Sequence, residues 1–253
     1  MEHNKAKKTN PPLQYALSQK IPVLCGLIKN GKAPMSKQKF TSFRRQRNRN
    51  QTTNRNPSRE GQLRAVAHRL GMDFTVFQEY SVTREVADFE LFRKGKNRVS
   101  YHLMEKQDEW MENNIKIFDY QFETGTAKNR RTVAQTVFLM KSKDLGLPQF
   151  VMKPETFFHK IASYFGKQDI DFERFPKFSG NYLLQGEDEE YIRFKMTDEI
   201  LHFFSRERGW HMEGINYYLI LYKENHRLRP SSVRQLYERG MGLFELLKDK
   251  PFL

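Results

Sequence analysis

The residues best suited to chemistry in this chain are cations that gather at the tip of a predicted hairpin. Gly125 and Thr126 allow close backbone approach, and Lys128, Arg130 and Arg131 follow them directly. Lysine and arginine bind phosphate oxygens, and successive turn amides add an anion-binding concavity. The loop lacks the GxxxxGK[ST] spacing that wraps a nucleotide. The pattern permits a simple anion site, although most charge runs of this kind are solvated basic tips.

A second basic turn, residues 93–98, repeats the Lys-Asn-Arg triplet of the first. It adds Lys96 and Arg98 to the candidate anion ligands. The two turns form one cationic patch if they lie on the same side of the fold.

Acidic side chains form two further groups. Asp169, Asp171 and Glu173 alternate along a DIDFE segment, and residues 187–190 form an acidic run. Carboxylates two residues apart on an extended chain can share a divalent cation. The spacing of a calcium loop is absent, however, and the acidic run suits the start of a helix. The DIDFE carboxylates are therefore weak metal candidates.

Established catalytic signatures are missing from the sequence. The seven histidines form no HExxH motif, and neither a GxSxG elbow nor a GxGxxG fingerprint occurs. Cys25 is the only cysteine, so no intramolecular disulfide and no thiolate cluster can form. We therefore assign no catalytic residue and expect no cofactor.

Most of the net charge of +14 lies at the N-terminus. Residues 1–57 hold 13 of the 44 Lys and Arg residues but only one acidic residue, Glu2, and residues 58–253 are nearly neutral. The tail is poor in aliphatic residues from residue 29 to residue 56, so we expect it to be disordered and residues 58–253 to form one domain. Its arginines bind polyanions by counterion release. These arginines are Arg44, Arg45, Arg47, Arg49 and Arg55.

The spacing of apolar residues along the chain predicts the strands and helices that position these side chains. Residues 115–123 alternate between apolar and polar side chains and predict a half-buried strand, with residues 132–140 as its hairpin partner. Further strands are predicted at residues 150–152, 210–215 and 217–222, and helices at 58–70, 155–165, 183–194, 198–206 and from Pro230 onward. Neighbouring strands with helices between them predict an α+β fold, with an antiparallel sheet built from hairpins and helices packed on one side.

The predicted hairpin also carries a resemblance. Residues 118–132 read FDYQFETGTAKNRRT, and Gln135-Thr136-Val137 follows. Here the chain resembles a group of uncharacterised conserved bacterial proteins that share an FDYxYxTGxGKxRRTxxQT-like hairpin. The resemblance extends through residues 168–173 and 182–189, and covers most of residues 60–250. The chain departs from the pattern at Phe122, where the group often has Tyr, and at Ala127, where it often has Gly. The resemblance implies no activity.

These observations support three hypotheses. The first is a non-catalytic binding or adaptor module whose basic tail contacts RNA, DNA or another polyanion. The alternative is an enzyme acting on a phosphorylated or nucleic-acid substrate, which requires the basic tip and the DIDFE carboxylates to meet. The third is assembly with a protein partner. The apolar run Ile21–Ile28 is too short for the ~20 residues of a membrane span. We expect a cytoplasmic protein.

Overall fold

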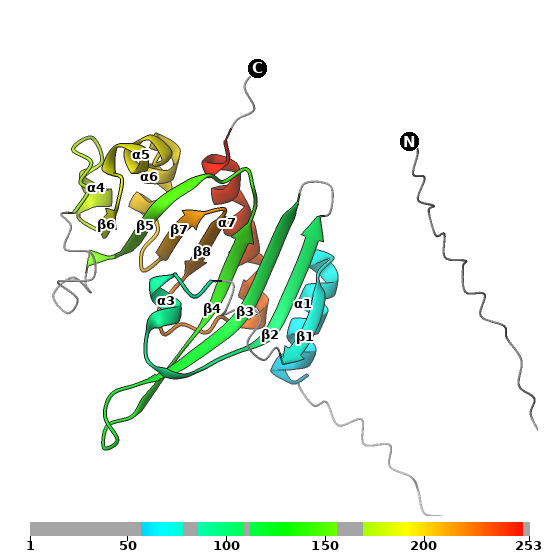
Figure 1. The fold of residues 1–253 in the computed structure, drawn as a ribbon. Helices are drawn as coiled ribbons and strands as arrows, with labels where there is room; N and C mark the ends of the chain where they lie inside the picture. Colours follow the sequence, from blue (N-terminus) through cyan, green and yellow to red (C-terminus); the bar gives the residue numbers. More distant parts are fainter. Residues whose placement is uncertain (1–56, 78–85, 109–111, 156–168, 250–253) are drawn as a thin grey trace, which may run out of the picture. The chain divides into compact units, whose positions relative to one another are not determined.

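The computed structural model describes residues 57–77, 86–108, 112–155 and 169–249, which belong to a compact unit spanning Asn54–Leu253. The predicted disordered tail and nearly all of the predicted helix at residues 155–165 lie outside these ranges. Figure 1 shows the described elements.

The centre of this unit is an antiparallel sheet of eight strands in the order β1-β2-β3-β4-β8-β7-β5-β6 (Figure 1). The strands are β1 Asp73–Phe77, β2 Lys96–Asp108, β3 Asn113–Thr124, β4 Arg131–Lys141, β5 Leu147–Pro154, β6 Tyr182–Gly186, β7 His211–Asn216 and β8 Tyr218–Tyr222. The predicted hairpin is confirmed as β3 and β4, which pair from Asn114↔Lys141 to Thr124↔Arg131. The predicted closing hairpin is confirmed as β7 and β8.

Six helices accompany the sheet in the described ranges. They are α1 Arg59–Leu70, α3 Glu90–Arg93, α4 Pro176–Ser179, α5 Glu189–Lys195, α6 Asp198–Arg206 and α7 Pro230–Leu247. The ends of α1 follow the predicted signals: the Ser58 hydroxyl accepts a hydrogen bond from the Gly61 amide at 3.2 Å, and Gly71 ends the helix with φ of 63°.

Two apolar clusters cover the two faces of the sheet. The helix-side cluster joins strand residues such as Ile117, Phe138 and Leu219 to α1, α4, α5, α6 and α7. The α3-side cluster consists of Val86, Phe89, Leu91, Phe92, Leu103, Phe118, Tyr120, Phe122, Val137, Leu139, Ile220 and Tyr222. The predicted α+β class is thus confirmed, with most helices on one face. The four-residue helix α3 packs on the other.

One element was assigned wrongly from the sequence. Residues 183–194 were expected to be a single helix, but residues Tyr182–Gly186 form strand β6, and α5 begins only at Glu189. The run Tyr182-Leu183-Leu184 is buried on both faces of β6, so its apolar side chains do not alternate. A short apolar run of this kind does not distinguish a buried strand from a helix.

Two glycines of α7 give a matched test of its packing on β4. A Cβ atom at Gly240 would lie 2.4 Å from the buried ring of Phe138, whereas nothing lies within 4 Å of one at Gly242. We expect Gly240→Ala to lower the free energy of unfolding by about 1–3 kcal/mol through overpacking. Gly242→Ala should raise it by about 0.5–1 kcal/mol through helix propensity. Urea unfolding of both variants measures this, and shifts of the same sign would contradict the packing.

Candidate functional site

The basic turn at residues 93–98 sits directly on strand β3. Gly95 has φ of 63°, and a Cβ atom there would lie 2.4 Å from the Glu123 carbonyl oxygen. Only glycine permits this approach. The Arg98 guanidinium donates hydrogen bonds to the carbonyl oxygens of Arg93, Lys94 and Gly95 at 2.6–3.2 Å. Arg98 therefore holds the turn together from within.

The loop between β3 and β4 is closed in a similar way. Gly125 has φ of 92°, and a Cβ atom there would lie 2.2 Å from the Asn129 carbonyl oxygen. The Asn129 amide donates a hydrogen bond to the Thr126 carbonyl oxygen at 3.0 Å. The two glycines of the basic turns are thus required by backbone geometry.

The two basic turns lie side by side and line one groove of about 400 Å³. Gly95, Lys96 and Asn97 come from one turn, and Glu123 to Ala127 together with Arg130 come from the other. Glu123 is the only carboxylate among these lining residues, and it accepts a hydrogen bond from the Asn97 side chain at 2.7 Å and pairs with Arg130 at 3.5 Å. We call this feature the two-turn groove.

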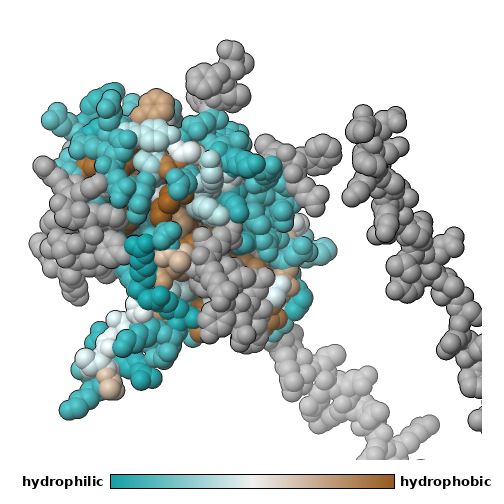
Figure 2. All heavy atoms as spheres, viewed as in Figure 1, coloured by the Kyte–Doolittle hydropathy of each residue, from teal (hydrophilic) through white to brown (hydrophobic). Residues whose placement is uncertain are grey.

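The two-turn groove lies on a projecting arm. The loop that joins β3 and β4 lies at the end of two long strands and extends beyond the other described elements (Figure 1). The arm carries mainly hydrophilic side chains at its surface (Figure 2). Lys128 and Arg131 are exposed on the same arm, beside the lining cations Lys96 and Arg130. Of the five anion candidates in the described domain, two therefore line the groove and two more are exposed on the same arm.

The acidic candidates lie elsewhere. The Asp169 carboxylate accepts a hydrogen bond from the Leu184 amide at 2.9 Å, and burial raises its pKa to about 6. Asp171 and Glu173 line a separate hollow of about 450 Å³ whose residues include none from the two-turn groove. In the described part of the chain, no three His, Cys, Asp or Glu side chains are grouped as metal ligands. The enzyme hypothesis requires the basic tip and the DIDFE carboxylates to lie in one site, and the described residues do not bring them together.

The acidic run forms the helix start that was predicted for it. The Asp188 side chain accepts a hydrogen bond from the Tyr191 amide at 3.0 Å, and Glu189 and Glu190 lie in the first turn of α5. The tail arginines lie outside the described residues.

A buried group of charges behind α3 was missed from the sequence. The Glu213 side chain on β7 is only 1% exposed, and its carboxylate accepts hydrogen bonds from the Glu90 amide at 2.6 Å, the Leu91 amide at 3.2 Å and the Tyr222 hydroxyl at 2.9 Å. It therefore binds the first amides of α3 to the sheet.

Further ionisable side chains surround this carboxylate. Glu90 pairs with Lys94 at 3.4 Å and with the buried Lys153 at 3.6 Å, and Lys94 also reaches Glu224 at 3.3 Å. The His211 Nε2 atom lies 3.8 Å from Glu224. We call Glu90, Lys94, Lys153, His211, Glu213, Tyr222 and Glu224 the α3 charge cluster.

Burial dominates the acid–base behaviour of this cluster. It raises the pKa of Glu213 to about 7, with a contribution from the nearby Glu90 carboxylate. It lowers the pKa of His211 to about 3, so this imidazole is neutral near pH 7. Burial alone would lower the pKa of Lys94, but Glu224, Glu90 and Glu213 together raise it. Groups with strongly shifted pKa values concentrate at functional sites more often than elsewhere.

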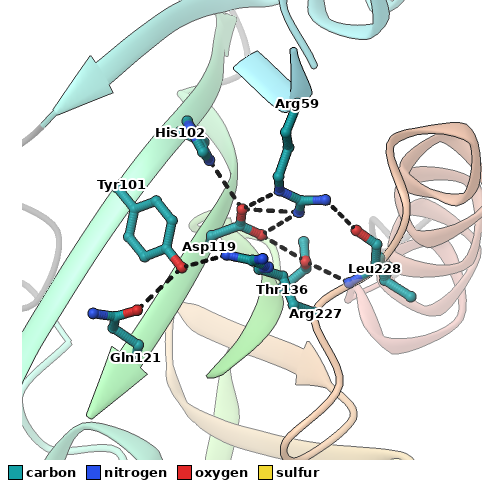
Figure 3. A network of polar contacts seen from close by, with 8 residues as sticks. All are labelled: Arg59, Tyr101, His102, Asp119, Gln121, Thr136, Arg227 and Leu228. Atoms are coloured by element: carbon teal, nitrogen blue, oxygen red, sulfur yellow. Dashed lines mark hydrogen bonds and ion pairs between the residues drawn. The ribbon is translucent and has the colours of Figure 1, made fainter. Parts of the chain in front are cut away.

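A second polar network lies on the helix side of the sheet (Figure 3). The Asp119 carboxylate accepts hydrogen bonds from Arg59 Nε at 3.0 Å and Nη2 at 2.8 Å, and from the Thr136 hydroxyl at 2.7 Å. It also lies 3.0 Å from His102 Nδ1. Strand β2 has a bulge between Tyr101 and Met104, which brings both Tyr101 and His102 to the Asp119 face. This network joins α1 to three strands.

Comparisons with known proteins leave the function open. No protein-family model and no curated protein sequence matches this chain. The crystal structure of the mycobacterial trehalose monomycolate transport factor A, TtfA, is similar, with a TM-score of 0.48 and 10% sequence identity over 78% of this chain and 100% of that one. No helix within the described ranges is long and apolar enough to cross a membrane.

Proposed function

We propose that this protein is a non-catalytic binding module that holds the phosphate backbone of a nucleic acid in the two-turn groove. The observation that carries the proposal is that two basic turns, distant in sequence, line one groove on a projecting arm. Lys96, Lys128, Arg130 and Arg131 supply the positive charge. Arginine and lysine at close range bind phosphate oxygens through charge-assisted hydrogen bonds.

The shape of the arm supports the same proposal. A two-stranded antiparallel ribbon is one of the elements that enter the major groove of duplex DNA. Mainly hydrophilic side chains cover the projecting part of β3 and β4 (Figure 2). The arginine-rich tail adds sequence-independent attraction for polyanions, as its composition predicts.

The enzyme hypothesis receives less support. It needs a phosphate-binding tip and metal-binding carboxylates in one pocket, and the described residues place these in two hollows without a common member. We also propose a cytoplasmic location, which agrees with a nucleic-acid partner, and a relationship to the bacterial hairpin proteins, which implies no activity.

Salt-dependent binding to a short labelled DNA tests the proposal with the full chain. Replacing Lys128, Arg130 and Arg131 with glutamine should lower the affinity for a DNA duplex and reduce the slope of log K against log salt by about three. A control replaces Arg174, Lys177 and Arg206, which are exposed on other elements. It changes the net charge equally and should leave the slope nearly unchanged. Equal effects of both triple substitutions would contradict a localised site.

A further inference from the structure

The basic turn at residues 93–98 is continuous with helix α3. The helix ends at Arg93, and the turn that forms one wall of the two-turn groove follows at once. Phe89, Leu91 and Phe92 bury their side chains in the α3-side cluster. The position of this wall therefore depends on how firmly α3 is docked on the sheet.

Glu213 is the polar anchor of that docking. Its carboxylate accepts hydrogen bonds from both the Glu90 and Leu91 amides, the first two of the helix. Lys94, at the other end of α3, pairs with Glu224 at 3.3 Å, beyond the end of β8. Polar contacts at both ends thus fasten α3, and the first of them involves a fully buried acid.

We propose that Glu213 is a positioning residue for the two-turn groove, and that proton binding at its carboxylate regulates how firmly α3 and the following basic turn are held. The effect of this proton on nucleic-acid binding rests on the function proposed above for the two-turn groove. The docking equilibrium itself does not.

The sign of the regulation follows from linkage. Burial gives the docked Glu213 carboxyl a pKa of about 7, above the ordinary value of 4.5 that it regains when α3 undocks and water enters. The docked state therefore holds its proton more tightly, and docking is favoured as the pH falls below 7. The population of the state with α3 undocked should rise about tenfold as the pH rises from about 6 to about 8.

Other ionisable groups surround Glu213 on each neighbouring element. They are Glu90 and Lys94 of α3, Lys153 of β5, His211 of β7, Tyr222 of β8 and Glu224. The pKa of His211 is lowered to about 3 and that of Tyr222 is raised well above its ordinary value by burial. Neither group changes charge between about pH 6 and about pH 8, so the pH dependence in this range is assigned to Glu213.

Hydrogen exchange of the full chain tests the inference. After correction for the intrinsic exchange rate, protection of residues 89–98 should fall about tenfold from about pH 6 to about pH 8. Glu213→Gln should remove this dependence, while the exposed control Glu173→Gln should keep it. Tyr222→Phe removes a hydrogen bond that lowers the pKa of Glu213 and should move the midpoint upward. Protection that does not vary with pH, or varies equally in Glu213→Gln, would overturn the proposal.

Binding of the labelled DNA across the same pH range separates this proposal from the proposed function. The wild-type affinity should fall more steeply with rising pH than that of Glu213→Gln, because only the wild type loosens its groove wall. If the Lys128, Arg130 and Arg131 substitutions leave the affinity unchanged, the proposed function fails, even where α3 protection follows the pH. If these substitutions weaken binding and Glu213→Gln has the wild-type profile, only the regulation fails.

Discussion

Replacing Asp119 with alanine is expected to lower the free energy of unfolding by about 3–5 kcal/mol. The substitution removes the acceptor of the Arg59 guanidinium, whose side chain is only 23% exposed, and so leaves a partly buried charge without its partner. It also leaves the Thr136 hydroxyl without the acceptor at 2.7 Å. Urea unfolding measures the loss.

Glu60 provides the control for this substitution. It lies beside Arg59 at the start of α1 and pairs with Arg64 at 3.0 Å, with both side chains largely exposed. Glu60→Ala should cost less than about 1 kcal/mol, because exposed ion pairs contribute little. The double variant Arg59→Met/Asp119→Leu should be less destabilised than Asp119→Ala, since it leaves no buried charge. A cost for Asp119→Ala no larger than for Glu60→Ala would contradict the assigned role.

A loss of similar size is expected for Lys153→Met. The Lys153 side chain is 3% exposed and lies 3.6 Å from Glu90 Oε2, an atom that has no hydrogen-bond partner in the described structure. Without Lys153 this buried carboxylate keeps only Lys94, at 3.4 Å, of its two compensating cations, which should lower the free energy of unfolding by about 3–5 kcal/mol near neutral pH.

Two comparisons make this second prediction specific to the α3 charge cluster. Lys143→Met removes a cation that pairs with Glu112 at the surface and should cost less than about 1 kcal/mol. Adding Glu90→Gln to Lys153→Met should restore part of the lost stability, because an amide is less costly to bury than a carboxylate that has lost one of its two cations. Absence of any restoration would show that the loss arises from packing around Lys153 and not from charge.

The parts of the fold with local patterns were predictable from the sequence. The alternation of residues 115–123 and the capping residues Ser58 and Gly71 are local signals, and the structure confirms β3 and α1. Strand β6 was not predictable in this way, because its consecutive apolar residues are buried on both faces of the strand. A regular alternation of apolar and polar residues arises when one face of a strand is exposed to water. Strand β6 has almost no exposed face and therefore no such alternation.

The candidate site was predictable in composition but not in arrangement. The cations of each basic turn stand out in the sequence, whereas their shared groove depends on the close approach of Gly95 to the Glu123 carbonyl. Glu213 gave no signal, because an acid in a short strand is normally interpreted as a solvent-facing residue. Only the tertiary fold shows that two helix amides and a tyrosine hydroxyl meet its carboxylate.

The most direct test of the central claim is a hydrogen-exchange footprint of a short DNA duplex bound to the full chain. If the two-turn groove holds the phosphate backbone, both turns, residues 93–98 and 124–131, should gain protection together, and the protection should fade as salt rises. Protection confined to the N-terminal tail, with both turns exchanging as in the free protein, would contradict the claim.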